Sequence, residues 1–394
     1  MGVLHLPARN SADHRTGRSV GIAAPHVRGQ LLKLAVIAAA LLLAVAPLPA
    51  TLVERMYSGG AYLLFQPVVT TITNRVPFLL LDAGVAGALA ALLVFVGRQI
   101  HRWRRRRVSS EARAASGGWS GGVATVSNIL LVAAVVYLAF EACWGLNYRR
   151  TPLTARLDFD RGRVTRTAAI DWLDRAVENL NDGYAPAYRA PWPQARDLPE
   201  HLGPAFARAQ RFLGARRTAT PGLPKRTLLT PYFRWAGIDG VTNPFGLDIT
   251  INPQVLPAER PFVVAHEWGH LAGLANEAEA SFLAWLTCMQ GDAQAQYSAW
   301  LSVLGHLVGA VPRDERRSIV GALEEGPRRD LAGMAARSRQ TLPAVRVVAW
   351  QAYDRFLRAN RVPEGIASYD LVAELLLGTR FDEKTGTAPV LRKR

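Results

Sequence analysis

The sequence has 394 residues, of which 49% are hydrophobic and 20% are charged. A chain this long and apolar is neither a disordered protein nor a coiled coil, and two cysteines exclude a disulfide scaffold and any four-thiolate zinc site. The net charge of +16 fits three classes: a nucleic-acid-binding protein, a protein with a basic surface, and a membrane protein whose basic residues mark the inner side.

Three apolar stretches are long enough to cross roughly 30 Å of bilayer hydrocarbon. They cover residues 34–52, 76–96 and 123–144. The leader, residues 1–33, has a net charge of +4, and the Arg-rich loop between the second and third stretches, residues 98–113, has +6. Because basic short loops stay on the cytoplasmic side, we expect a cytoplasmic leader and loop, a three-span region over 34–145 and an extracytoplasmic domain over 146–394.

Two alternatives remain open for these segments. The segment 46–50, near the end of the first span, ends in small residues as a signal-peptide cleavage site does, but Leu48 suits the minus-three position poorly, so we expect an uncleaved anchor. The arginines of 98–113 also resemble a nucleic-acid patch, but their place between two spans favours the topological interpretation, and we expect no nucleic-acid partner. Asp82 and Glu141 lie near span ends, where their carboxylates can reach the interface.

The segment after the third span is large enough for its own core. Residues 163–184 have the spacing of an amphipathic helix, 186–204 form a proline-rich loop, and the alternation in 247–252 predicts a short strand. Helical patterns follow over residues 261–274, 277–290, 293–311, 343–359 and 368–378. We therefore expect a mainly α fold: three N-terminal transmembrane helices, then a mostly helical α+β domain with a short strand before the active-site helix.

The sharpest motif is His266-Glu267-Trp268-Gly269-His270, on one of these helices. Residues four apart lie on one helix face, so both imidazoles can reach one zinc ion. Glu267 lies beside the metal, where it can take a proton from metal-bound water. The alternative is a surface helix, but the flanking residues are apolar, and a buried His-Glu-His cluster is costly unless a metal satisfies it.

A catalytic zinc needs a third protein ligand. Gly273 suits a helix stop and sharp turn, after which Glu277 and Glu279 open the next helix. They point about 200° apart on that helix, so only one faces the metal. We favour Glu277, because Ala280 and Ser281 leave its face small enough for close packing. Glu279 is then a candidate partner for a ligating histidine.

These motifs resemble the zincin metallopeptidases of the gluzincin type. The resemblance implies that His266, His270 and Glu277 bind Zn²⁺ and that Glu267 is the general base. Two features depart from the pattern: the gap between His270 and Glu277 is short, and Ser281 stands where Asp or Asn is usual. The second departure puts in doubt the support of a ligand histidine.

Most of the chain after the first span also resembles a bacterial membrane family, the domain of unknown function 3810. The similar segments are Trp144 to Arg149, Glu277 to Ala280, Tyr297-Ser298 and Gly365 to Asp370. This resemblance implies three spans and a metallopeptidase domain. We expect the protein in the bacterial inner membrane, with a zincin-like metal core at about 228–311. It names no substrate.

We therefore expect a membrane-anchored zinc metallopeptidase that hydrolyses a periplasmic or envelope polypeptide. Zincins generally present substrate along a strand edge, and strand 247–252 is the candidate in sequence. Tyr297, His306 and Tyr369 are candidate oxyanion donors, although each suits a packed residue better. The main alternative is a membrane-anchored binding or scaffold protein with the same fold and little turnover.

Overall fold

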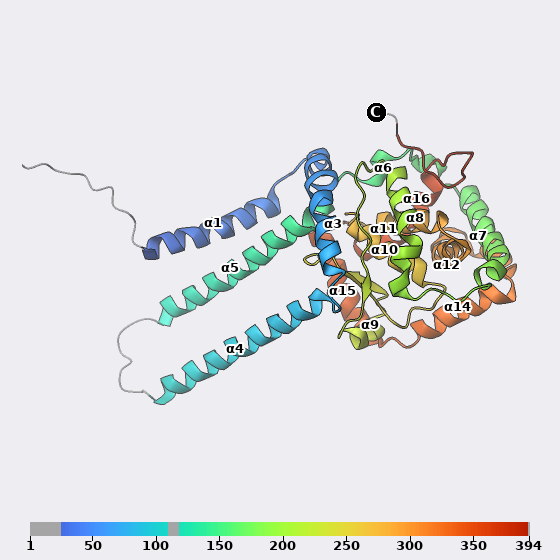
Figure 1. The fold of residues 1–394 in the computed structure, drawn as a ribbon. Helices are drawn as coiled ribbons and strands as arrows, with labels where there is room; N and C mark the ends of the chain where they lie inside the picture. The colour runs from blue at the N-terminus through green and yellow to red at the C-terminus, as the bar shows by residue number, and fades with distance from the viewer. Residues whose placement is uncertain (1–24, 109–117, 393–394) are drawn as a thin grey trace, which may run out of the picture. The chain divides into compact units, whose positions relative to one another are not determined.

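The computed structural model describes residues 25–108 and 118–392, and these are mainly helical, with a small sheet (Figure 1). Within these described residues, three helices are long and apolar enough to cross a membrane, as in a membrane protein. Their apolar parts are Arg28–Val45, Leu80–His101 and Thr125–Cys143. The expected cytoplasmic leader (1–33) and Arg-rich loop (98–113) lie partly outside the described residues. Where they are described, residues 25–33 and 98–108 are helical and continue into the first two apolar helices, so the prediction of a loop from residue 98 is wrong.

The ends of the first two apolar helices differ from the sequence prediction. Helix α1 (Pro25–Val45) ends before the predicted boundary at residue 52, because Pro47 and Pro49 cannot continue a helix. Helix α4 (Leu80–Val108) begins after the predicted residue 76, because Pro77 interrupts the apolar run. Helix α5 (Gly118–Cys143) agrees with the predicted third span at its C-terminal end.

The chain forms two compact units. The first contains α1 and residues 118–137 of α5, where Lys33 Nζ donates a 2.7 Å hydrogen bond to Asn128 Oδ1. The second unit contains 47–108 and 138–392 among the described residues. It includes α4 and all of the candidate site.

The segment between α1 and α4 is helical and belongs to the second unit. It consists of α2 (Ala50–Leu52), η1 (Val53–Ala61) and α3 (Tyr62–Thr73). The Tyr62 hydroxyl donates to the backbone oxygen of Leu271 at 2.8 Å. A segment that the sequence presents as a connection between two spans therefore packs on the domain that follows them.

The two acidic residues near span ends make contacts inside the second unit. Asp82, in the first turn of α4, accepts hydrogen bonds from Thr227 Oγ1 at 2.7 Å and from Leu228 N at 2.9 Å. Glu141 pairs with Arg149 at 3.5 Å. The carboxylate of Asp82 thus ties the start of α4 to the domain.

The domain is built from helices of 3 to 22 residues. They are η2 (Gly145–Arg149), α6 (Leu153–Arg156), η3 (Arg161–Arg163), α7 (Arg166–Ala187), η4 (Ala195–Asp197), α8 (Leu198–Phe212), α9 (Thr230–Ala236), α10 (Arg260–Leu271), α11 (Glu277–Met289), α12 (Ala293–Ala310), α13 (Arg313–Gly321), α14 (Glu325–Ser338), α15 (Pro343–Ala359), η5 (Gly365–Asp370) and α16 (Leu371–Gly378). The prediction of a loop throughout 186–204 is wrong, because α8 begins at Leu198 with Pro199 in its first turn, where proline is tolerated.

The sheet has the strand order β1-β3-β2. Strand β3 (Ile249–Ile251) pairs in parallel with β1 (Pro224–Lys225) and antiparallel with β2 (Gly240–Thr242). The predicted strand at 247–252 therefore exists, but it is central and has a partner on both edges. The prediction that this strand offers a free edge to a substrate is wrong, because its backbone groups are already paired with β1 and β2.

Helix α10 lies in the centre of the domain. It packs against α8, α11 and α12 and against strands β2 and β3. Trp268 is fully buried and donates from Nε1 to the backbone oxygen of Gly222 at 2.8 Å. The neighbouring α11 is buried along almost its whole length, so the two helices form a rigid base for any side chain that projects between them.

Candidate metal centre

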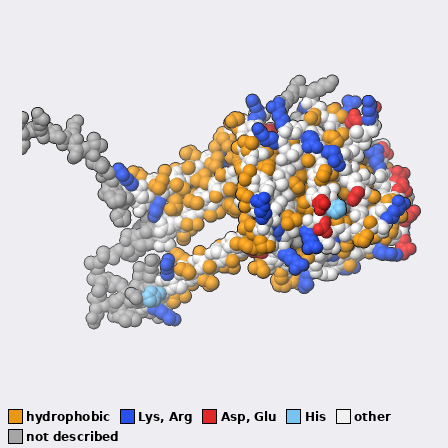
Figure 2. Space-filling view, viewed as in Figure 1, with side chains coloured by type: hydrophobic (Ala, Val, Ile, Leu, Met, Phe, Trp, Pro, Cys, Tyr) orange, Lys and Arg blue, Asp and Glu red, His pale blue; other side chains and the backbone are white. Residues whose placement is uncertain are grey.

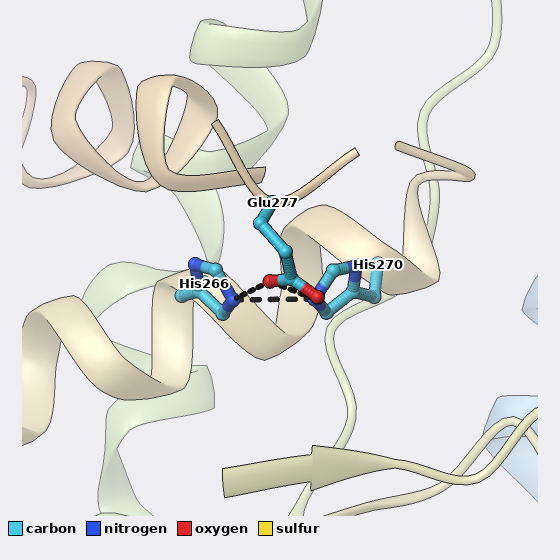
Figure 3. A group of neighbouring side chains, drawn as sticks. All are labelled: His266, His270 and Glu277. Atoms are coloured by element: carbon cyan, nitrogen blue, oxygen red, sulfur yellow. Dashed lines mark hydrogen bonds and ion pairs between the residues drawn. The ribbon is translucent and has the colours of Figure 1, made fainter. Parts of the chain in front are cut away.

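The turn between α10 and α11 sets the geometry of the site. Gly273 has a φ of 77°, in the left-handed region, which confirms the predicted sharp turn. Asn276 caps α11, with Oδ1 accepting hydrogen bonds from two backbone N–H groups of the first turn. Glu277 thereby becomes the first residue of α11, and its side chain points at the two histidines of α10 (Figure 3).

Three potential ligand atoms converge at this point. Nε2 of His266 and Nε2 of His270 lie 3.2 Å apart, and Oε2 of Glu277 lies 3.1 Å from the first and 3.3 Å from the second. Zinc bonds of about 2.0–2.1 Å at tetrahedral angles place neighbouring ligand atoms about 3.3 Å apart. The three separations therefore have the size of the edges of one tetrahedral site. Among the described residues, this is the group of His, Cys, Asp and Glu side chains that could hold a metal ion.

The other ring nitrogen of each histidine has its own partner. Nδ1 of His270 lies 2.8 Å from the backbone oxygen of Leu274, to which it can only donate. In the neutral ring, Nε2 is then the unprotonated nitrogen, as a metal ligand requires. Nδ1 of His266 lies 3.0 Å from Oγ of Ser281. Ser281 thus reaches His266 although it stands where Asp or Asn is usual in gluzincins.

The two glutamates of α11 point in different directions, as their spacing predicts. Glu277 joins the histidines, whereas Oε1 of Glu279 accepts a 2.7 Å hydrogen bond from the backbone N–H of Leu153. Glu279 is therefore used in packing α11 against the start of α6 and supports neither histidine, contrary to the expectation from the sequence.

The charge of Glu277 is matched by its neighbours. Burial raises the pKa of this carboxyl, but His270 and His266 outweigh that effect and hold the pKa well below its usual range. Burial lowers the pKa of His270, and Glu277, with smaller contributions from Glu267 and Leu274, raises it to about 9. The pocket is thus built to hold positive charge against a buried carboxylate, which is the property that a cation site needs.

Glu267 is buried beside this cluster and is held by strand β2. Thr242 Oγ1 donates to its Oε2 at 2.7 Å. A Cβ on Gly240 would lie 2.9 Å from Cγ of Glu267 and closer still to Oε1, so only glycine lets the strand approach. Burial raises the pKa of Glu267 despite the nearby imidazoles. A carboxylate with a raised pKa is better suited to accept and return a proton near neutral pH.

Two tyrosines outside the predicted site residues, Tyr353 and Tyr148, lie close to Glu277. The Tyr353 hydroxyl, from α15, donates to Oε1 of Glu277. Burial raises the pKa of Tyr148 strongly, and the negative charge of Glu277 adds to it. Tyr353 lies 76 residues from Glu277 in the sequence, and neither local spacing nor a motif links the two.

The three candidate oxyanion donors have different surroundings. The ring of Tyr369 stacks on His266, with centroids 6.4 Å apart, so it lies at the site. The Tyr297 hydroxyl instead donates to Asp330 at 2.6 Å. His306 faces Asp370 at 3.4 Å.

The C-terminal end of α10 is held by residues that follow α5. Trp144 Nε1 donates to the backbone oxygen of His270 at 2.9 Å. The Arg150 guanidinium donates to the backbone oxygen of Gly273 at 2.7 Å and makes two 2.9 Å hydrogen bonds to the carboxylate of Glu54. These contacts occupy backbone acceptors that the end of a helix leaves open, and they fix the turn that positions Glu277.

The fold and site define a mainly helical protein with three candidate membrane spans and a cluster of two histidines and a glutamate on two packed helices. Residues 57–377 match the model of a family described as a protein of unknown function, DUF3810. The match covers most of the chain, and the chain belongs to this family. No curated protein and no solved structure matches it.

Proposed function

We propose that this protein is a membrane-anchored zinc metallopeptidase that hydrolyses peptide bonds of an envelope or periplasmic polypeptide. The observation that carries the proposal is the convergence of Nε2 of His266, Nε2 of His270 and Oε2 of Glu277 at separations of 3.1–3.3 Å. Two imidazoles and a carboxylate are a ligand set of catalytic zinc sites, which keep a fourth position for water or substrate.

The residues of the chain have distinct roles in this proposal. When bound, zinc supplies the Lewis acidity that polarises a scissile carbonyl and acidifies water. His266, His270 and Glu277 hold the ion. Glu267 takes a proton from water and passes it to the leaving amine, and Thr242 keeps the Glu267 carboxylate oriented toward the site through the bond to Oε2.

Strand β2 is the better candidate for binding a substrate strand. It is an edge strand of the sheet, and it lies against the helix that carries the motif. An extended peptide that pairs with the free edge of β2 would add a strand by β-augmentation. Its scissile bond would then pass close to Glu267, which contacts Thr242 of the same strand.

The charge pattern supports an extracytoplasmic location for the domain. The basic leader and the basic segment 98–113, which includes the C-terminal part of α4, flank candidate spans, and short basic segments stay in the cytoplasm. With three spans, the segment that follows α5 is then on the opposite side, the periplasmic side of a bacterial inner membrane. The lipid bilayer and a polypeptide are the proposed partners.

A catalytically weak binding or scaffold protein is the second candidate. It is favoured by the burial of Glu277 and by the hydrogen bond that Tyr353 donates to its Oε1, which leave little room around that ligand.

The two candidates differ in the effect of Glu267→Gln. The full chain, purified in detergent with zinc, is incubated with fluorescein-labelled casein and with a library of quenched fluorescent peptides. For a peptidase we expect cleavage by the wild type, loss of cleavage in Glu267→Gln, retained zinc in both, and no change in the exposed control Glu325→Gln. Zinc binding without cleavage by the wild type would favour the scaffold.

A further inference from the structure

Helix α3 exposes an apolar stripe and buries several polar side chains. Its buried face carries Gln66 and Thr70 beside the apolar Tyr62 and Leu63, while Leu64, Val68 and Ile72, spaced four residues apart, are 55–58% exposed. A helix on the surface of a water-soluble domain exposes polar side chains along such a stripe. The exposed stripe of α3 therefore faces an apolar environment.

The buried polar groups of α3 are bonded to the domain. Gln66 Nε2 donates to the backbone oxygen of Thr220 at 3.0 Å, and Thr70 Oγ1 donates to that of Leu247 at 2.8 Å. Because these bonds satisfy the polar groups, α3 cannot rotate its apolar stripe inward without breaking them.

A second unpaired apolar surface lies on α15. Of its 17 residues, Leu357 is buried, whereas Val348 is 66% and Trp350 48% exposed. Helix α9 packs against α15, and an open apolar groove between them is lined by Tyr232 and Val348 among other residues. Tyr353 and Phe356 hold α15 on the domain, and the exposed Val348 and Trp350 remain available for a further apolar contact.

Both surfaces border the start of a candidate membrane span. Leu228, two residues before α9, is 82% exposed, and its backbone N–H donates to Asp82 in the first turn of α4. Helix α3 reaches α4 through a connection of six residues, in which Phe78 is 51% exposed. Figure 2 shows hydrophobic side chains along α4 and over the part of the domain around α3.

We propose that α3, Leu228 and α15 rest on the bilayer that α4 enters, with Leu64, Val68, Ile72, Leu228, Val348 and Trp350 in contact with lipid. The occupant is a lipid surface because these elements lie beside the start of α4, whose own exposed apolar side chains are those of a candidate membrane span. Trp350, with Arg346 and Arg355 on the same helix, has the composition of a helix at a membrane interface.

The candidate metal centre would then lie on the same side of the domain as the proposed lipid contact. Helix α15 carries both Trp350, on the lipid-facing surface, and Tyr353, which bonds to Glu277. Any molecule that reaches the site past α15 therefore does so beside the headgroups. This inference does not rest on the proposed hydrolysis, because it follows from exposure and contacts outside the metal cluster.

The test is depth-dependent quenching of a fluorophore on the full chain in vesicles of phosphatidylcholine and phosphatidylglycerol. The Cys143→Ser background leaves Cys288, which is fully buried. The environment-sensitive fluorophore NBD is attached at Val68→Cys, Val348→Cys and, as a control, Ser318→Cys on exposed α13. Lipids with a nitroxide on the acyl chain quench from within the bilayer, and iodide quenches from water.

We expect acyl-chain nitroxide to reduce the fluorescence at positions 68 and 348 at least about twofold, because interfacial helices bury their apolar face about 5–10 Å deep. Iodide should quench position 318 alone. Quenching of 68 and 348 by iodide and not by lipid would overturn the proposal. Protection of both positions from both quenchers would also overturn it, since a protein segment, a second copy or another helix of this chain would then cover the surface.

Discussion

The Tyr353 hydroxyl donates a hydrogen bond to Oε1 of Glu277, so the carboxylate that faces both histidines through Oε2 is held from the other side by α15. The contact fixes the orientation of the carboxylate and leaves one oxygen for a metal. Tyr353 therefore positions a proposed ligand without being one.

Replacing Tyr353 tests this positioning role. Tyr353→Phe removes the donor and keeps the ring, so we expect about 10-fold weaker zinc binding, as for other residues that orient metal ligands. Zinc affinity is measured by competition with a chromophoric chelator. Tyr232→Phe, on the exposed side of α9, is the matched control and should bind zinc like the wild type. Equal affinity of all three proteins would refute the role.

Substitutions of the two glutamates of α11 should have different effects on the zinc content. Glu277→Gln replaces a proposed ligand and should lose most of the bound zinc, because a neutral amide is a poor ligand for this ion. Glu279→Gln should retain zinc, because Glu279 is bonded to the backbone N–H of Leu153. The measurement is the zinc-to-protein ratio after dialysis. Loss of zinc in Glu279→Gln alone would show that Glu279, and not Glu277, is the third ligand.

The contact between β2 and Glu267 makes a glycine substitution informative. In Gly240→Ala the new Cβ would overlap the Glu267 carboxylate, so we expect at least about 100-fold lower hydrolysis through loss of the general base, with zinc retained. Gly305→Ala meets no atom within 4 Å on α12 and should leave both properties unchanged. The same turnover in both variants would mean that the position of Glu267 does not matter.

The bond between Glu54 and Arg150 predicts a pH dependence of stability. Burial raises the pKa of Glu54, but Arg150 and Arg156 outweigh this and hold the pKa below its usual value of 4.5. A depressed carboxyl pKa stabilises the folded state above about 4.5, and the contribution is lost as the pH falls through the folded-state pKa.

The free energy of unfolding of Glu54→Gln should therefore be about 2 kcal/mol lower than that of the wild type at pH 7. This difference should shrink as the pH falls below 4.5. Thermal unfolding of both proteins in detergent between pH 3.5 and 7 checks this. A difference that stays constant over that range would rule out the ion pair as its cause.

The sequence predicts those parts of this structure that depend on local patterns. The spacing of His266 and His270 and the glycine at 273 predict a helix, a turn and a second helix, and α15 has the predicted bounds because Pro343 suits the first turn. The opposite directions of Glu277 and Glu279 follow from helix geometry alone.

The parts that were missed depend on contacts between distant segments. Nothing near Tyr353 in the sequence indicates that it reaches Glu277, and the pairing of β3 on both edges follows from β1 and β2, which are too short to predict. The sequence of α3 does not indicate that its polar side is buried, because Gln66 and Thr70 bond to backbone groups far along the chain.

The zinc content of the purified full chain tests the central claim most directly. Inductively coupled plasma mass spectrometry should find about one zinc per chain in the wild type and in Glu267→Gln, and almost none in His270→Ala, since the claim assigns the metal to His266, His270 and Glu277. A wild type without zinc after loading, or His270→Ala with a full equivalent, would contradict it.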